Sequence, residues 1–393
     1  MAGERTLATL VSYRKRYQKA NRMGRSKLLD EFCATTGYHR KYAIALLRRP
    51  LEDKACAVRR RRGVTYSAAG IRVLEKVWEA AGYPWSVRLK ALLPQWLPWA
   101  RLHMRGVTPQ IEAELLKMSP RQMDRRLKTS RRDRKRRIYG HSKPGTLLKQ
   151  QIPIRTDHSD IVCPGFLEVD LVEHCGPCAS GEFVYSLNAT DVYTGWTQTR
   201  AVLGKGGTGV CTALEEFRRE LPFALLGIDS DNGSEFINQH LLRWTARLGV
   251  KFTRSRSYKK NDNAHIEQKN WTHVRKIFGW DRYDTAEQCA AMNAVYRGDL
   301  LQMMNLFQPC VKLVEKVRIG SRVRRRYDKP KTPLDRLASH YPLDALPLAV
   351  QRLLAARENM DPFALSSRID KALSRLLRTT NAGRAKETGV SVI

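Results

Sequence analysis

The sequence contains no long uninterrupted hydrophobic run. No apolar stretch approaches the roughly 18 residues of a membrane-spanning helix, and the chain does not start with a cleavable secretory signal. These absences argue against a membrane protein and against a secreted one. We therefore expect a soluble cytoplasmic protein with no membrane partner.

Cysteine is sparse, and it is scattered along the chain. Eight cysteines in 393 residues have neither the density nor the spacing of a small disulfide-stabilised domain, so we expect reduced thiols. His174, Cys175 and Cys178 in HCGPC are similar to half of a zinc site, but no second Cys/His pair occurs at matching spacing. A turn between two strands is the alternative interpretation of this motif.

Acidic residues are few relative to basic ones. The chain has 71 Lys plus Arg against 38 Asp plus Glu, which gives a formal net charge of +33. A surface of this kind repels itself unless it meets a polyanion. Nucleic acid is the leading candidate partner, and an anionic membrane surface is the alternative. A length of 393 residues also suggests two or three domains.

Residues 1–62 show two amphipathic helix signals separated by a short break. The apolar stripe over 28–32 is interrupted at 35–37, and a second helix follows. This layout suits a helix-turn-helix whose second helix presents Arg40 and Lys41 to DNA. A helical hairpin with a solvated basic face has the same spacing.

Residues 63–137 repeat this layout in a second all-helical region, with the break at 118–120. A basic run, RRDRKRR, closes the region, and we expect it to contact phosphates, with a solvated linker as the alternative. The residues of this region that we expect to bind DNA are Arg121, Arg125, Arg126, Arg131 and Arg132.

Residues 138–164 lack periodicity and contain several glycines and prolines, which indicates a linker. From 165 to 306 the pattern predicts three strands, a helix, a strand, a helix, a strand and a helix. Such an order builds an α/β domain with a mixed sheet and helices against its faces. The apolar run FALLGI, 223–228, is expected to be a buried central strand.

Three carboxylates in this domain stand where chemistry is expected. Asp170 lies in the middle of the first strand, where burial is costly unless a cation compensates it. Asp231 follows the central strand, at the end where open α/β sheets place their active sites. Glu267 lies one turn into a helix that Asn263 could cap. Converging at one edge of the sheet, the three acids could hold two divalent cations for an in-line phosphoryl displacement.

The stretches around these acids resemble the DDE catalytic core of retroviral-type integrases and bacterial insertion-sequence transposases. They are LEVDLV around Asp170, IDSDNGSEF around Asp231 and KKNDNAHIEQKN around Glu267. Between Asp231 and Glu267 lie 35 residues, an interval typical of that family, and Asn270 completes its ExxN pattern. The resemblance is best over about 160–305.

This resemblance implies an RNase H-like fold with a five-stranded mixed sheet. It also implies nicking of DNA followed by strand transfer, with two Mg²⁺ or Mn²⁺ ions held by Asp170, Asp231 and Glu267. The partners would be element terminal repeats and target DNA, which implies a homo-oligomer when active and association with the bacterial nucleoid when bound. The zinc module of retroviral enzymes is absent from the sequence, so the helical regions would recognise the DNA ends.

Other residues of the domain have competing interpretations. Asp229 could replace Asp231 as a ligand, but the Asp-Asn-Gly arrangement favours Asp231. Glu168 is expected to be a flanking or exposed acid, and Asp191 to cap a turn. A basic loop before the last helix could grip substrate phosphates or simply be solvated. The residues of this domain that we expect to bind DNA are Lys259, Lys260 and Asn270.

Residues 307–393 form a basic C-terminal region. Helices are predicted over 348–356 and 372–378, and the composition of 379–393 predicts a disordered tail. These features together predict a DNA transposase. A DNA-binding regulator with an inactive core, or a structure-specific nuclease of the same fold, would share most of them.

Overall fold

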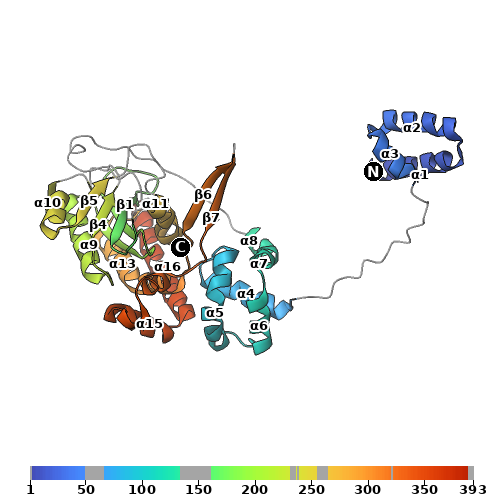
Figure 1. Cartoon of the computed structure of the whole chain (residues 1–393). Helices are drawn as coiled ribbons and strands as arrows, with labels where there is room; N and C mark the ends of the chain where they lie inside the picture. The colour runs from blue at the N-terminus through green and yellow to red at the C-terminus, as the bar shows by residue number, and fades with distance from the viewer. Residues whose placement is uncertain are drawn as a thin grey trace. The chain divides into compact units, whose positions relative to one another are not determined.

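The computed structural model describes residues 2–48, 66–132, 161–230, 239–254, 264–319 and 322–387, together with Phe236. By their contacts the residues divide into two compact units, Met1–Thr65 and Tyr66–Ile393. Figure 1 shows the elements of both units. The linker predicted over 138–164 lies almost entirely outside the described residues.

The described residues of the first unit form α1 (Ala2–Lys19), α2 (Arg22–Thr36) and α3 (Arg40–Arg48). The Asn21 side chain accepts a backbone hydrogen bond that starts α2, and Gly37 ends the helix with a left-handed backbone, φ 70°. The predicted pair of helices is therefore present, and its DNA binding stays a prediction. The small core of this unit consists of Tyr17, Leu28, Leu29, Phe32, Ala43 and Leu47.

The second unit starts with a group of short and medium helices. They are α4 (Ala68–Ala80), α5 (Ser86–His103), α6 (Pro109–Lys117), α7 (Pro120–Arg126) and α8 (Lys128–Arg132). The Ser119 side chain caps α7, whose first residue is Pro120, and this explains the break predicted at 118–120. That α6 and α7 bind DNA stays a prediction.

The sheet of the second unit has five strands. They are β1 (Phe166–Glu173), β2 (Val184–Asp191), β3 (Thr197–Leu203), β4 (Gly227–Ser230) and β5 (Lys251–Arg254). Their order is β3-β2-β1-β4-β5, and β1 pairs antiparallel with β2 but parallel with β4, so the sheet is mixed. The connecting and following helices are α9 (Gly207–Glu220), α10 (Gln239–Leu248) and α11 (Ala264–Lys269). The predicted order of strands and helices is confirmed.

One face of the sheet is apolar and packs against α9 and α10. Side chains alternate between the two faces of a strand, so Leu167 and Val169 of β1 share this face, and both are buried. Arg200 of β3 is buried here as well, and its guanidinium donates to the carboxylates of Glu216 and Glu220 on α9. Further members of this core are Leu187, Ala189, Val210, Leu214, Phe217, Ile228, Leu241, Trp244 and Phe252.

The strand predicted over 223–228 is displaced in the structure. β4 begins only at Gly227, and 223–226 form the loop that leads into it. The amides of Leu226 and Gly227 both donate to the Gly165 carbonyl, which aligns this loop with the start of β1. The prediction was wrong in its bounds because an apolar run does not by itself specify backbone conformation, and none of the residues 223–226 is fully buried.

The opposite face of the sheet is covered by a helical layer that continues from α11. It comprises η1 (Asn270–Arg275), α12 (Lys276–Phe278), α13 (Ala286–Val295), η2 (Tyr296–Leu300) and η3 (Met303–Phe307), of which the η segments are π-helical. Buried side chains of this layer form one hydrophobic core with those of α4, α5, α6 and α7. The helices of 66–132 are therefore part of the same unit as the sheet.

The C-terminal region begins with a hairpin that the sequence analysis did not predict. β6 (Leu313–Ile319) pairs antiparallel with β7 (Arg322–Tyr327) (Figure 1). Large apolar side chains such as Ile319 are exposed on this hairpin. The remaining elements are α14 (Pro333–Ala338), the 3-10 helix η4 (Leu343–Ala345), α15 (Leu348–Glu358) and α16 (Pro362–Glu387). α16 continues into the segment whose composition predicts a disordered tail. Within the described ranges, no helix combines the length and the apolar character that crossing a membrane requires.

Gly165→Ala should destabilise the second unit. Gly165 has φ +119°, which residues with a side chain rarely adopt, and an added Cβ would lie 2.5 Å from the Ala224 carbonyl oxygen. We expect the free energy of unfolding, measured by urea denaturation, to fall by roughly 2 kcal/mol or more. Gly209→Ala in α9 is the matched control. An added Cβ there would lie at an ordinary van der Waals distance of 3.9 Å from Val202 Cβ, so this change should raise the free energy of unfolding by about 0.5–1 kcal/mol. A Gly165→Ala protein as stable as the wild type would contradict this close approach.

Candidate catalytic site

Asp170 lies on the face of β1 that points away from the apolar core. Val169 and Leu171 pack on the side of α9 and α10, and strand alternation directs Glu168 and Asp170 to the opposite side, beneath α11. Asp170 is half-buried, and its Oδ1 accepts a hydrogen bond from the Leu171 amide over 2.8 Å. The carboxylate is therefore held by hydrogen-bond donors from its surroundings.

A row of polar side chains crosses the sheet beside Asp170. The strand register places Asp170 opposite Asn188 of β2, and Asn188 opposite Thr199 of β3. Asn270 of η1 reaches this row: its Nδ2 donates to Asp170 Oδ2 over 2.6 Å, and its Oδ1 accepts from Asn188 Nδ2 over 2.9 Å. Thr199 Oγ1 donates to Asn188 Oδ1 over 3.0 Å. We call Asp170, Asn188, Thr199 and Asn270 the Asp170 network.

The helix that carries Glu267 is bound to β1 on both sides of that residue. The Ile266 amide donates to Glu168 Oε2 over 2.9 Å, and Asn270 donates to Asp170. The backbone of Glu267 belongs to α11, while its side chain lies outside the described residues. The helix with the third predicted acid thus lies against the strand with the first.

The second predicted acid lies outside the described residues. β4 ends at Ser230, which is opposite Val169 of β1, and Asp231 is the next residue in the chain. Lys259 and Lys260 also lie outside the described residues. The described side chains include no group of three His, Cys, Asp or Glu that could hold a metal ion, but only one of the three predicted carboxylates is among them. Metal binding by the three acids therefore stays a prediction.

The structure corrects the interpretation of Glu168 as a flanking or exposed acid. Its exposed fraction is 0%, because strand alternation places it under α11, where the Ile266 amide binds its carboxylate. Asp229 of β4 is its partner in register and is also buried. Thr253 Oγ1 of β5 donates to Asp229 Oδ1 over 2.6 Å. The sequence analysis considered Asp229 as an alternative metal ligand to Asp231. The structure shows that Asp229 has a hydrogen-bond partner within the sheet.

Asp191 caps the turn after β2, as the sequence predicted. Its Oδ2 accepts hydrogen bonds from the amide and the hydroxyl of Thr194, over 2.7 and 2.6 Å, and its Oδ1 accepts from the Gly165 amide over 2.8 Å. Burial raises the pKa of Asp191, and these hydrogen bonds oppose the rise. The residue joins the turn after β2 to the start of β1.

The HCGPC motif forms a turn after β1. His174 is buried and shares a hydrogen bond of 2.7 Å with Ser186 Oγ, and burial lowers the pKa of His174 to about 3, with a smaller contribution from the positive charge of Arg275. Cys178 is exposed, and Arg282 donates to its carbonyl over 2.8 Å. Because the histidine faces the core while this cysteine is at the surface, the contacts favour the turn interpretation over half of a zinc site.

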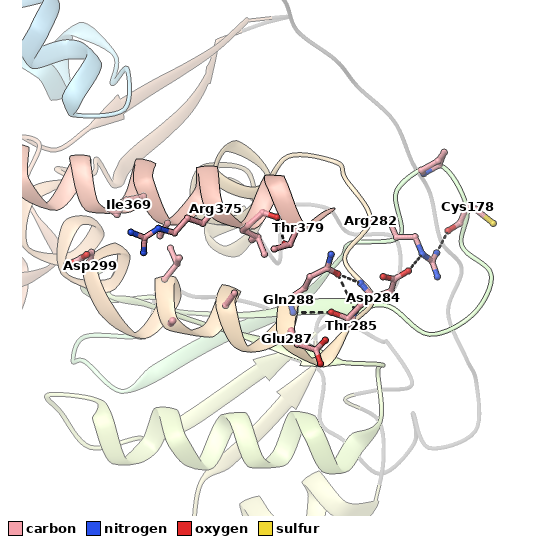
Figure 2. Close-up of a pocket in the computed structure, with 16 residues that line it drawn as sticks. Cys178, Arg282, Asp284, Thr285, Glu287, Gln288, Asp299, Ile369, Arg375 and Thr379 are labelled. Atoms are coloured by element: carbon pink, nitrogen blue, oxygen red, sulfur yellow. Dashed lines mark hydrogen bonds and ion pairs between the residues drawn. The ribbon is translucent and has the colours of Figure 1, made fainter. Parts of the chain in front are cut away.

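A pocket of about 830 Å³ lies between α13 and α16. Figure 2 shows Arg282 and Asp284 toward one end of it and Asp299 and Arg375 toward the other. No member of the Asp170 network contributes to its walls. This pocket is therefore separate from the candidate catalytic site.

The predicted DNA-binding residues have different surroundings. Arg40 forms an ion pair with Asp30, whereas the side chains of Arg131 and Arg132 lie outside the described residues. Asn270 is engaged in the Asp170 network. DNA contact by each of them stays a prediction. The predicted cations that are exposed on α3 or α7 are Arg40, Lys41, Arg121, Arg125 and Arg126.

The sequence analysis did not predict Asn188 or Thr199 as site residues. A signal was present in β2, where Ser186, Asn188 and Thr190 alternate with other residues in a strand that is buried along its whole length. Buried polar groups are nearly always hydrogen-bonded, so alternating polar residues in such a strand indicate a polar layer beneath a neighbouring element.

Three similarities to known proteins bear on this site. Residues 164–260 match the integrase core domain family, a range that contains the first two predicted acids. The chain is 40% identical over 329 residues to the uncharacterized protein y4rM of Sinorhizobium fredii, a match that covers 82% of this chain and 92% of that protein. The crystal structure of the catalytic core domain of BIV integrase matches at 14% identity and a TM-score of 0.29, over 43% of this chain and 91% of that chain.

Asn188→Ala should destabilise the second unit by about 1–3 kcal/mol, because it leaves two buried hydrogen-bonding groups of its neighbours without a partner. Urea denaturation of the full chain measures the loss. Thr199→Val is the matched control: it removes a single donor at the end of the Asp170 network and should cost only about 1 kcal/mol. If Asn188→Ala costs no more than Thr199→Val, Asn188 is not the central member of the network.

Proposed function

This chain belongs to the same protein family as y4rM and contains an integrase core domain, and on this premise we propose that it is a DNA transposase. It binds the ends of a mobile element and catalyses metal-dependent phosphodiester cleavage and strand transfer. The observation that carries the proposal is the attachment of α11 to β1 on both sides of Glu267. This attachment supports a shared site for the first and third acids.

The covalent chain supports a place for Asp231 in the same site. Val169 and Ser230 are opposite each other in the parallel pair of β1 and β4, and Asp170 and Asp231 are the residues that follow them. Consecutive Cα atoms are about 3.8 Å apart, so Asp231 is confined to the end of β4. We infer that the three carboxylates meet at this end of the sheet, where open α/β folds bind their ligands.

The donor set suits hard divalent cations, because all three ligands are carboxylates. Asp170, Asp231 and Glu267 would hold two Mg²⁺ or Mn²⁺ ions, which would supply an activated water or 3′-hydroxyl and neutralise charge on the leaving oxygen. Asn270 is a positioning residue: by donating to Asp170 Oδ2 it fixes the orientation of the carboxylate, as the outer hydrogen-bond partners of metal ligands do.

The DNA partner is supported by the net charge of +33, which favours a polyanion. Helices α3 and α7 present exposed cations, and we propose that they contact the element ends. Because two ends must be held together during transposition, the active form contains more than one copy of the chain. The proposed DNA-binding residues are Arg40, Lys41, Arg121, Arg125, Arg126, Arg131, Arg132, Lys259, Lys260 and Asn270.

Asp170→Asn, Asp231→Asn and Glu267→Gln should each abolish cleavage and strand transfer but preserve binding of end-bearing DNA. The neutral side chains keep the shape of the carboxylates but lose the charge that a divalent cation requires. The assay is nicking and joining of labelled DNA that carries the element ends, with Mg²⁺ or Mn²⁺ present and with EDTA added. Glu182→Gln, at an exposed position, is the control and should retain activity.

If any of the three variants still joins DNA in the presence of metal, the substituted residue is not one of the metal-binding catalytic acids. Nicking without joining by the wild-type chain would indicate a nuclease. Specific DNA binding with neither activity would indicate a regulator.

Lys41→Ala should weaken DNA binding by the full chain. Lys41 is exposed in the first turn of α3, and the loss of one phosphate contact reduces the slope of log K against log salt concentration by about one. Fluorescence anisotropy at several salt concentrations measures this slope. Lys27→Ala, exposed on α2, is the control and should keep the wild-type slope. Identical slopes for Lys41→Ala and the wild type would exclude Lys41 from the DNA contacts.

A further inference from the structure

A small pocket lies where the start of α5 meets the helix that follows Glu267. Its volume is about 100 Å³, which accommodates a group of a few heavy atoms. Arg88 of α5, Lys269 of α11 and Lys276 of α12 line it, and its walls contain no Asp or Glu. We call it the cationic pocket. Its composition favours an anionic ligand.

The cations of the pocket are buried to an unusual degree. Lys269 is 9% exposed, and Arg88 is half-buried. Within the described part of the chain, neither side chain forms an ion pair with a carboxylate, whereas Lys276 donates to the Gly82 carbonyl. A buried charge without a counter-ion is costly, so the pocket is incomplete without a ligand.

A buried imidazole also lines this pocket. His273 is 6% exposed, and its Nδ1 shares a hydrogen bond of 2.8 Å with Thr272 Oγ1. Its Nε2 has no hydrogen-bond partner among the described residues. The Thr272 hydroxyl also donates to the Gln268 carbonyl over 3.1 Å. The imidazole is therefore a buried polar group that lines the pocket and leaves one ring nitrogen without a partner among the described residues.

We propose that the cationic pocket binds a phosphate group. Arg88 and Lys269 supply charge-assisted hydrogen bonds, which match the several acceptor oxygens of a tetrahedral anion. The ligand is either a phosphodiester of bound DNA or free inorganic phosphate. Only the first of these sources rests on the proposed transposase function.

The position of the pocket gives phosphate binding a consequence for the catalytic helix. Lys269 is two residues after Glu267 and directly precedes Asn270, which holds Asp170. Arg88 belongs to the helices of 66–132. A phosphate bound by both cations therefore ties the helix with Glu267 to α5. If the bound phosphate belongs to DNA, the helix with Glu267 is held more firmly when DNA is bound.

The test uses thermal unfolding of the full chain during titration with sodium phosphate, with sodium chloride at matched ionic strength. Phosphate should raise the Tm of the wild type, because a ligand that binds only the folded state stabilises it. Lys269→Met and Arg88→Gln should each weaken the apparent phosphate affinity by about tenfold or more. Lys205→Met and Arg105→Gln, both at exposed positions, are the matched controls and should respond like the wild type.

The outcomes separate a built site from a general salt effect. Without phosphate, Lys269→Met should melt no lower than the wild type, because it removes an uncompensated buried charge. If Lys269→Met does not fold, Arg88→Gln, which changes only a half-buried side chain, carries the test. A phosphate effect of the same size in the wild type and in Arg88→Gln, or no effect in the wild type, would overturn the proposal.

DNA binding distinguishes the two sources of the phosphate. If the ligand is a DNA phosphodiester, Lys269→Met lowers the salt slope of duplex binding by about one, and inorganic phosphate competes with DNA. Loss of phosphate binding with an unchanged salt slope supports the pocket with free phosphate as its ligand. Neither measurement involves cleavage, so a chain that fails to nick or join DNA would refute the transposase function and leave the phosphate result standing.

Discussion

The second unit depends on one constraint, which is that the polar side chains buried on one face of its sheet must find hydrogen-bond partners. Glu168 and Asn188 are completely buried there, and Asp170 is half-buried. Each such group would cost about 1–3 kcal/mol if it were left unsatisfied. The segment that follows β5 supplies two of these partners, the Ile266 amide and the Asn270 side chain. The Thr199 hydroxyl and the Leu171 amide supply further ones. Polar contacts, and not only apolar packing, therefore determine where the helix with the third acid lies.

The two faces of the sheet are covered in different ways, and this has a consequence for the helices of 66–132. The apolar face packs against α9 and α10, whereas the polar face lies under a layer that shares its core with α4 to α7. Trp96 of α5 packs against Phe363 of α16 at 5.1 Å between ring centroids, and Gln308 donates to the Ala81 carbonyl over 2.8 Å. Any DNA held by α7 would therefore be held in a fixed relation to β1.

Periodicity predicted the order of strands and helices because it records which residues are buried. It failed over 223–226, where the apolar residues lie in a loop and are partly buried or exposed, since apolar character does not require a strand. It failed for Glu168 because its partner, the Ile266 amide, is distant in the sequence and becomes a neighbour only in the fold. The hairpin β6–β7 was missed because its apolar residues are exposed and mark no buried face. Motifs identified Asp170, but the role of Asn188 depends on strand register, which no local pattern specifies.

The helix that follows β5 serves two surfaces at once. Residues four apart lie on the same side of a helix. Ile266 and Asn270 therefore form one stripe, which bonds to β1, and Lys269 and His273 form the adjacent stripe, which lines the cationic pocket. Because a hydrogen-bonded helical turn moves as one body, a ligand that draws Lys269 toward α5 also shifts the donor that orients Asp170. The pocket and Asp170 are thus connected through a single turn of backbone, and no hinge or domain movement is required.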